Sequence, residues 1–322
     1  MKITILRNNR EVLDTKYEEI DTNDGIYDDV HSVRNALISL GYKVKELVVD
    51  EEIKILKKLK TDLVFNLCDD FLDPMKEAVV PLVLQQKNIK YTGSGSSSLL
   101  ITANKYLAKL KFLQSNIPTP NFQLFINSNQ RLRSDLKFPL IVKPNNEHGS
   151  IGITARAVVK NEEELYKRIR FIMKEKCNAL VEEYIDGKEI TVVLIGKKNP
   201  MVLPVSEIVF KGFENKPKIM SYEAKWVKDD FAYQQTFRKT PADITKAEEK
   251  EIIKQCKKAY KAIGCKGYGR VDLRLKNGIP YILEVNPNPD LSEDAALSNI
   301  ARESGMTYND LIKKIIDLAI KE

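Results

Sequence analysis

Short apolar runs alternate with amphipathic segments in the first third of the chain. Runs with the length and apolar character of strands occupy residues 2–6, 44–49, 62–67 and 89–91. Apolar side chains recur at helical spacing in residues 31–40, 53–59 and 76–86. Because strands alternate with helices, this part of the chain is predicted to form a mostly parallel sheet covered by helices.

A glycine- and serine-rich run, TGSGSSS at residues 92–98, is the sharpest change of composition. It predicts a junction between domains, at which Ser98 or a neighbouring serine caps the next helix. A phosphate-binding loop is the alternative interpretation, although no lysine stands at the spacing of a Walker motif.

The remainder of the chain mixes helices and strands. Helices are predicted at residues 162–174, 247–263 and 308–320, and strands at residues 268–275 and 279–285. Gly264 is expected to end the second of these helices. The pattern as a whole predicts an α/β (α+β) fold with three units, at residues 1–94, 95–180 and 181–322.

Charge and composition exclude several classes of function. The 322-residue chain has a formal net charge of +7, but its lysines alternate with glutamates, so we expect no nucleic-acid partner. A modest positive field suits a polyanionic nucleotide equally well. No run approaches the roughly 20 apolar residues that span a bilayer, and the first residues contain no export signal. We therefore expect a cytoplasmic protein without a membrane partner.

Two polar pairs near the C-terminus indicate a metal site. Arg270 and Asp272 lie two residues apart in one strand-like run, and Glu284 and Asn286 do so in the next, so each pair shares one face of its strand. Two carboxylates and an amide oxygen suit Mg²⁺ that also binds phosphate oxygens. Arg270 adds a permanent positive charge beside the metal ligands, which would stabilise an anion bound between Arg270 and the metal ion. The alternative is a solvent-facing hairpin with incidental charges.

The hairpin that joins these runs is constrained by geometry. In a regular hairpin the two pairs share one face only if positions 272 and 284 are opposite, which centres the turn on Gly278. A two-residue turn at Asn277 and Gly278 would put Asp272 and Glu284 on opposite faces. We therefore predict a three- or five-residue loop there, or a bulge.

Several longer motifs occur in a fixed order along nearly the whole chain. They are DLVFNL, KYTGSG, IPTP, FPLIVKPNNEHGSIG, LVEEYIDGKEITV and YEAKW, and most specifically IGCKGYGRVDLRL with YILEVNPNP. In these motifs the chain resembles the ATP-grasp family, and within it the D-alanine:D-alanine ligases. The resemblance implies an ATP-grasp fold with an N-terminal parallel α/β domain. It also implies ATP and Mg²⁺ as cofactors, with Mn²⁺ as an alternative ion, and a homodimer.

The resemblance assigns roles at the phosphates. Lys105 and Lys143 are implied to contact the phosphates of ATP, and Lys225 in YEAKW matches a loop lysine that reaches them as the site closes. Gly149 and Ser150 match a lid whose backbone N–H groups approach the phosphates. An ordinary surface lysine or hairpin turn is the alternative for each of these positions taken alone.

The resemblance also implies positions for the nucleoside and for the reacting group. Glu189 is implied to bind the ribose hydroxyls, and Arg270 to steady the acyl phosphate and the tetrahedral intermediate. Asp272, Glu284 and Asn286 are the implied metal ligands. The adenine is implied to lie against the backbone of Glu182, Glu183, Tyr184 and Ile185.

The chain departs from the D-alanine ligase pattern where the amino acids would bind. The glycine-rich signature after the first strand and the histidine after FNL are missing, the first lid serine is Gly149, and the tyrosine after Lys225 is Trp226. A glycine that helps form the oxyanion site is replaced by Asp290. We expect Trp226 and Asp290 to face the substrate, and Asp290 to recognise an amine. The alternative for Asp290 is a residue that begins a helix.

These observations predict an ATP-dependent carboxylate–amine ligase, of the acid–amino-acid type, that works through an acyl phosphate. Its partners would be a small-molecule carboxylate and an amine. The alternatives are a phosphotransferase on the same nucleotide platform, an authentic D-alanine:D-alanine ligase, and a nucleotide-binding module without catalysis. The last would be expected to have lost its metal ligands, and these are present.

Overall fold

The computed structural model describes residues 1–8, 28–49, 54–57, 59–69 and 76–321. Most of the segment LRNNREVLDTKYEEI, in which the sequence lacks the expected glycine-rich signature, lies outside the described residues, as does Asp70. Within the described ranges, no helix is both long and apolar enough to cross a bilayer.

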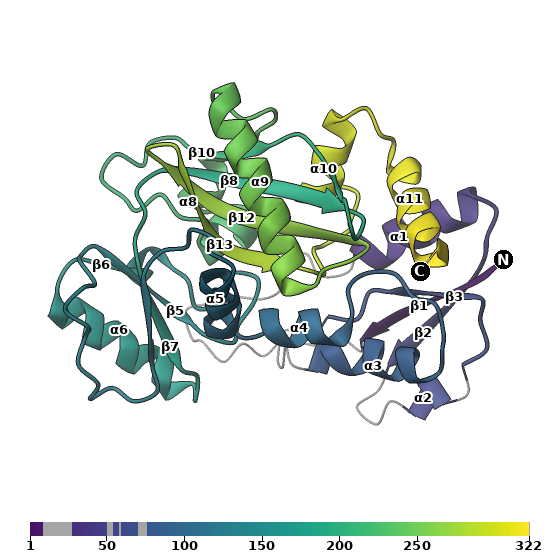
Figure 1. Ribbon diagram of the computed structural model, residues 1–322, viewed down its shortest axis with the longest axis horizontal. Helices are drawn as coiled ribbons and strands as arrows, with labels where there is room; N and C mark the ends of the chain where they lie inside the picture. Colours follow the sequence, from purple (N-terminus) through teal and green to yellow (C-terminus); the bar gives the residue numbers. More distant parts are fainter. Residues whose placement is uncertain (9–27, 50–53, 58, 70–75, 322) are drawn as a thin grey trace.

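The first unit is built on a three-stranded parallel sheet of order β2-β1-β3 (Figure 1). Its strands are β1 (Lys2–Asn8), β2 (Lys43–Val49) and β3 (Leu63–Asn66). Its helices are α1 (Asp28–Ser39), α2 (Lys54–Lys57), the 3-10 turn η1 (Lys76–Ala78) and α3 (Val79–Gln86). The predicted parallel sheet is confirmed. The strand predicted at residues 89–91 is wrong: only Tyr91 pairs with β3, through Val64, before Gly93 turns the chain with a φ of +85°.

The serine-rich junction leads into α4 (Ser96–Thr102) and then α5 (Lys105–Gln114). The prediction that a serine caps the first of these helices is wrong, because the cap position is Gly95, which makes no side-chain hydrogen bond. Ser98 lies inside the first turn, and its hydroxyl donates to the carbonyl of Gly264 over 2.8 Å. The serine therefore ties the junction to the C-terminal part of the chain.

The second unit is an antiparallel sheet of order β4-β7-β5-β6. Its strands are β4 (Phe122–Phe125), β5 (Leu140–Pro144), β6 (Val158–Val159) and β7 (Ala179–Glu183), and η2 (Ala155–Ala157) precedes β6. Helix α6 (Glu162–Lys174), predicted with these bounds, buries Leu165, Ile169 and Ile172 against the sheet.

The third unit is a larger antiparallel sheet of order β11-β10-β8-β12-β13, with β9 paired to β8. Its strands are β8 (Lys188–Ile195), β9 (Met201–Val202), β10 (Ser206–Phe210), β11 (Thr236–Lys239), β12 (Tyr268–Lys276) and β13 (Ile279–Asn286). Helix α9 (Lys246–Ile263) crosses one face of it, as Figure 1 shows. A capping box at Thr245 begins this helix, and Gly264 ends it with a φ of +81°, as predicted.

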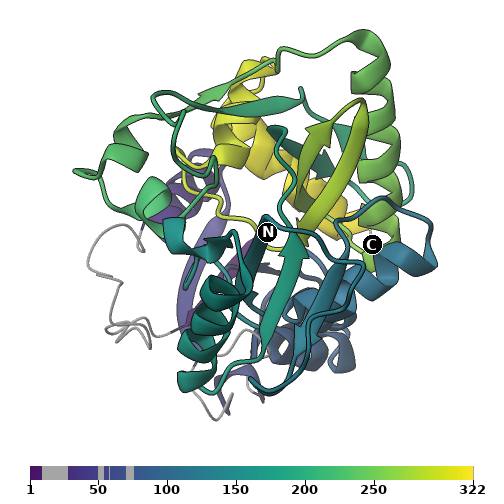
Figure 2. The same cartoon turned by 90° about the vertical axis from the view of Figure 1, so that its left-hand side faces the viewer.

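The C-terminal helices return to the start of the chain. Helices α10 (Ala296–Glu303) and α11 (Tyr308–Lys321) bury apolar side chains in the same core as β1, and α11 lies beside α1 in Figure 1. Among the described strands, those of the second and third sheets pair only within their own sheet, and Figure 2 gives the side view of this arrangement. The polar face of the third sheet, opposite α9, is the one that faces the functional site.

Candidate active site

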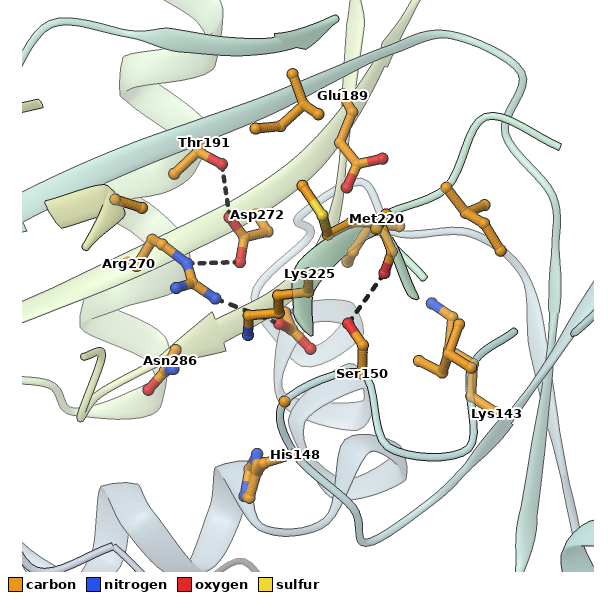
Figure 3. Close-up of a pocket in the computed structure, with 18 of the residues that line it drawn as sticks. Lys143, His148, Ser150, Glu189, Thr191, Met220, Lys225, Arg270, Asp272 and Asn286 are labelled. Atoms are coloured by element: carbon orange, nitrogen blue, oxygen red, sulfur yellow. Dashed lines mark hydrogen bonds and ion pairs between the residues drawn. The ribbon is translucent and has the colours of Figure 1, made fainter. Parts of the chain in front are cut away.

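A cavity of about 530 Å³ is lined by residues of the second and third sheets. Strand β5, the lid that follows it, the segment between β7 and β8, helix α7 (Tyr222–Trp226) and strands β12 and β13 all contribute to its walls. Every site residue singled out in the sequence lines this cavity, and several are drawn in Figure 3. Residues that are up to 185 positions apart in sequence, such as Lys105 and Asp290, therefore share one cavity.

A bulge in the hairpin of β12 and β13 places Asp272 opposite Glu284 although the turn has only two residues. Lys276 pairs with Ile279, so the turn is the two-residue turn at Asn277 and Gly278, with φ values of +51° and +75°. The register shifts by one residue at Leu283, after which Asp272 is opposite Glu284. The predicted opposition and the predicted bulge are confirmed. A turn centred on Gly278 is wrong, because the bulge restores the register without a longer loop.

The metal-ligand candidates lie in a row on the polar face of the sheet. Asp272 accepts hydrogen bonds from the Thr191 hydroxyl at 2.9 Å and from Nε of Arg270 at 2.8 Å (Figure 3). Asn286, opposite Arg270, accepts from the backbone N–H of Asn288 at 2.9 Å. These bonds fix the side chains while leaving further lone pairs on their oxygens. Two carboxylates and an amide on one face fit a hard, oxygen-seeking cation.

Glu284 is the more open of the two carboxylates, with 44% of its side chain exposed. Burial acts to raise the pKa of Glu284, but the charges of Lys105, Arg270 and other cations outweigh it and hold the pKa below its ordinary value. Its nearest cation, Arg270, lies 3.9 Å from Oε1. The carboxylate is therefore ionised and positioned within a strongly positive surrounding.

Lys143 at the end of β5 belongs to a buried charge cluster. Its Nζ lies 3.2 Å from Oε2 of Glu182, and Lys109 lies 3.3 Å from the same oxygen. Lys109 is fully buried and donates to the Thr119 hydroxyl at 2.9 Å. Burial acts to raise the pKa of Glu182, but the two ammonium groups outweigh it and lower the pKa. Burial lowers the pKa of Lys109 to about 8.

The lid between β5 and η2 is held against helix α7. Gly149 and Ser150 have φ values of +65° and +66°, so the chain turns sharply at the cavity. The indole N–H of Trp226 donates to the Gly149 carbonyl over 2.9 Å. The Ser150 hydroxyl donates to the Met220 carbonyl, also over 2.9 Å (Figure 3). Lys105 donates to the Glu147 carbonyl at the start of the lid. Trp226 therefore holds the lid to α7 through its indole.

Lys225 extends from α7 toward the metal-ligand candidates. Burial and the charge of Arg270, opposed by the charge of Glu284, lower its pKa to about 8. Burial also lowers the pKa of Lys105, against the opposing charge of Glu284. Two lysines with lowered pKa values on opposite walls are suited to bind an anion, which would restore their full charge.

The segment between β7 and β8 supplies the other end of the cavity. Glu189 accepts a hydrogen bond from Arg274 at 2.7 Å, and burial raises its pKa. Arg274 also donates to the Gly187 carbonyl at 2.9 Å. The four residues predicted to lie against the adenine, which line this end together, are Glu182, Glu183, Tyr184 and Ile185.

Asp290 lies at the far end of the cavity, with an exposed carboxylate. Its Oδ1 accepts from the backbone N–H of Ser292 at 2.8 Å, and helix α10 begins only at Ala296. Asp290 therefore does not cap that helix, but it does hold the turn before it. Asp69, Glu77 and Asp294 line the cavity as well, so this end is rich in acidic groups.

Three residues in or beside this cavity were not predicted from the sequence: Lys109, Arg238 and His148. Lys109 stands one helical turn after Lys105, and this spacing was the available signal. Arg238 on β11 donates to the Ser206 hydroxyl at 3.3 Å, and burial lowers its pKa. His148, next to Gly149 in the lid, also lines the cavity. No spacing rule identifies the last two, because only the fold brings β11 and the lid to the site.

Comparisons with known proteins identify the family of this chain. The family model for the C-terminus of D-ala D-ala ligase matches residues 112–317. A D-alanine–D-alanine ligase of Carboxydothermus hydrogenoformans is 30% identical over 301 residues, 90% of this chain and 92% of that protein. A protein of Sinorhizobium fredii, y4sG, is 34% identical over 260 residues, 80% of this chain and 74% of its own.

Solved structures share the fold. A D-alanine–D-alanine ligase from Bacillus anthracis, complexed with ATP, superposes with a TM-score of 0.75 at 23% identity, covering 100% of this chain and 98% of its own. The VanG D-Ala:D-Ser ligase from Enterococcus faecalis has a TM-score of 0.74 at 21% identity and covers 99% of each chain. At these identities the likeness concerns the fold.

Proposed function

Because the chain belongs to the D-alanine–D-alanine ligase family, an ATP-grasp family, it is an ATP- and Mg²⁺-dependent C–N ligase, and we propose that its residues act as follows. The carboxyl group of one small amino-acid-like molecule takes the terminal phosphoryl group of ATP and becomes an acyl phosphate. An amine then attacks the acyl carbon, an amide bond forms, and phosphate leaves. ADP is the other product.

Asp272, Glu284 and Asn286 are the proposed magnesium ligands. The opposition of Asp272 and Glu284 across the bulged hairpin carries the proposal, because it puts both carboxylates and the amide on one face of the sheet. A divalent cation held there supplies charge neutralisation at the phosphates. Arg270, held by Asp272 at 2.8 Å, is proposed to stabilise negative charge on the acyl phosphate and on the tetrahedral intermediate.

The remaining nucleotide contacts follow from the walls of the cavity. Lys105, Lys143 and Lys225 are proposed to bind the phosphates, and Gly149 and Ser150 to cover them from the lid. Glu189 is proposed to accept hydrogen bonds from the ribose hydroxyls through the oxygen that Arg274 leaves available. The adenine is proposed to lie against the segment of Glu182, Glu183, Tyr184 and Ile185, where the Glu182 carboxylate also orients Lys143.

The substrates are proposed to be a small carboxylate and an amine, at least one of them an amino acid. The Carboxydothermus relative is named as a ligase of two D-alanines, so D-alanine is the first amino acid to test. The acidic end of the cavity supports recognition of a cationic amino group by Asp290. Trp226 is proposed to shape this end from α7 while it holds the lid.

Hydroxylamine tests the proposed reaction, since it intercepts any acyl phosphate as a hydroxamate. Incubation with ATP, Mg²⁺, hydroxylamine and a panel of amino and organic acids is expected to yield a hydroxamate from one class of acid. Glu284→Gln is the matched blank, because it keeps the shape of the site. Phosphorylation of a hydroxyl compound without any hydroxamate would instead establish a phosphotransferase.

The three-unit division is proposed with one adjustment. Strand β7 (Ala179–Glu183) pairs with β4 and β5, so a boundary between residues 180 and 181 would divide a strand. We place the boundary between β7 and β8, and keep the junction near residue 95. A homodimer in the cytoplasm is proposed from the family alone, and sedimentation velocity of the purified chain tests the dimer.

A further inference from the structure

His148 is an imidazole in the lid whose surroundings differ from those of a structural histidine. It is half-buried and lines the cavity, and Figure 3 draws its ring among the residues there. Across the part of the chain that the structure describes, its ring nitrogens make no hydrogen bond to protein. The ring of His148 is therefore available to a ligand in the cavity.

The charges around His148 come from both walls of the cavity. Burial, together with the charges of Lys105 on α5 and Lys225 on α7, lowers its pKa to about 3. Glu284 on β13 acts on both of these lysines, and Glu147 precedes His148 in the lid. In the absence of an anion the imidazole is thus neutral between two cations.

An anion bound between the lysines would oppose their effect on His148. Lys105 and Lys225 are the two cations whose charges add to burial in lowering the pKa of His148, and both are proposed to bind phosphate. A negative charge within about 4 to 6 Å raises the pKa of a cationic acid by about 1 to 3. A rise of that size from about 3 leaves the imidazole neutral at pH 7, with one ring N–H that can donate to a phosphate oxygen.

We propose that His148 is a further catalytic residue of this ligase, whose neutral imidazole donates a hydrogen bond from the lid to the terminal phosphoryl group of ATP. The inference rests on the proposed function, because it requires the nucleotide phosphates to lie between Lys105 and Lys225. No covalent bond to His148 forms, and no proton is transferred to it. The ring N–H stabilises the negative charge of the phosphoryl group during its transfer.

The composition of the chain allows a direct measurement. There are two histidines, His31 and His148, and His31 is exposed on helix α1. Nuclear magnetic resonance of protein with ¹⁵N-labelled histidine rings gives two sets of signals, which His31→Gln assigns. We expect the ring ¹⁵N signals of His148 to shift when the β,γ-imido analogue of ATP and Mg²⁺ are added, because one ring nitrogen gains a hydrogen-bond acceptor, and the signals of His31 to stay unchanged.

The single tryptophan separates the two ways in which this test fails. Trp226 holds the lid through Gly149, so its fluorescence reports nucleotide binding in the same sample. If the fluorescence changes while the ring signals of His148 do not, the role of His148 is overturned and the ligase assignment stands. If the analogue does not bind at all, the proposed function is overturned together with the inference.

Variants give a kinetic test. His148→Ala is expected to reduce kcat about 10- to 100-fold, the loss for a hydrogen bond to a charged group, with a smaller change in KM for ATP. His148→Gln, which keeps a donor, is expected to recover part of the rate, and His31→Gln to match the wild type. Equal rates for His148→Ala and the wild type, with normal Trp226 fluorescence on binding, would overturn the proposal.

Discussion

The two ends of the cavity hold their charged groups in different ways. At the nucleotide end the charges are paired at short distances: Glu182 lies 3.2 Å from Lys143, and Asp272 lies 2.8 Å from Arg270. At the substrate end Asp290 is exposed, and its carboxylate is fixed through the backbone of Ser292. Substitution of one member of a buried ion pair leaves its partner without a counter-charge, whereas an exposed charged residue can be substituted alone. The nucleotide end is thus constrained, and the substrate end is free to vary.

Loss of a metal ligand is expected to have the largest effect, because it disables the constrained end. Glu284→Gln keeps the shape but removes one carboxylate charge, and we expect the rate of ADP release to fall about 1000-fold, corresponding to several kcal/mol of electrostatic stabilisation. Excess EDTA should abolish the activity of the wild type. Glu303→Gln, on the exposed end of α10, serves as the control. Wild-type activity in Glu284→Gln would remove this residue from the metal site.

Removal of the buried carboxylate tests whether the pairing itself constrains the nucleotide end. Glu182→Gln leaves Lys109 and Lys143 close to each other without their shared counter-ion. We expect the free energy of unfolding, measured in urea, to fall by about 3–5 kcal/mol, with weaker ATP binding. Glu183→Gln alters the next residue, whose carboxylate accepts from Asn121 at the surface, and should cost less than about 1 kcal/mol. Similar losses of stability in both variants would mean that the buried ion pairs do not constrain the nucleotide end.

The pH dependence of the reaction tests whether the nucleotide end requires the positive charge of Lys225. The pKa of Lys225 is lowered to about 8, chiefly by burial, so its ammonium form is present below pH 8 and is lost as the pH rises through 8. We expect kcat/KM for ATP to decline about 30-fold between pH 7 and pH 9.5, as the ammonium fraction of a group with a pKa of about 8 does.

Substitution by arginine tests this assignment. Lys225→Arg keeps its charge throughout that range, so its alkaline decline should disappear. Lys228→Arg, in the segment after α7, should retain the wild-type profile. An unchanged decline in Lys225→Arg would assign the titration to another group.

The substrate end should tolerate a substitution that the nucleotide end does not. Asp290→Asn removes the charge but keeps the hydrogen bond to Ser292, and we expect KM for the amino-acid substrate to rise about 10-fold while KM for ATP stays constant. Glu293→Gln, exposed beyond the same turn, is the control. If KM is unchanged for every substrate, Asp290 only holds the turn.

The smallest expected effect concerns the contact between the lid and α7. Trp226→Phe removes the donor to the Gly149 carbonyl, which contributes about 1 kcal/mol, so KM for ATP should rise about fivefold. Tyr233→Phe, on the short helix α8 (Phe231–Gln234), is the aromatic control. A shift in the substrate KM without any change for ATP would instead assign Trp226 to the substrate end alone.

The sequence by itself determined the elements and the chemistry of the constrained end. The alternation of side chains in a strand placed Arg270 with Asp272 and Glu284 with Asn286, and it required either a longer loop or a bulge to bring the two pairs to one face. Helix α6 was predicted with its observed bounds, because its apolar spacing and Asn161 cap are local signals. Such features depend on neighbours within a few residues, so they can be predicted from a single sequence.

Only the tertiary structure decided which distant groups meet. Lys109 joins Glu182 across 73 positions, and the bulge lies at Leu283, not at the turn, because pairing along β12 selects its place. His148 reaches the lysines of α5 and α7 only after the lid folds over the cavity. Ser98, whose local pattern indicated a helix cap, bonds instead to Gly264. Long-range packing overrides local preference at such positions, since burial of a polar group requires a partner wherever the fold supplies one.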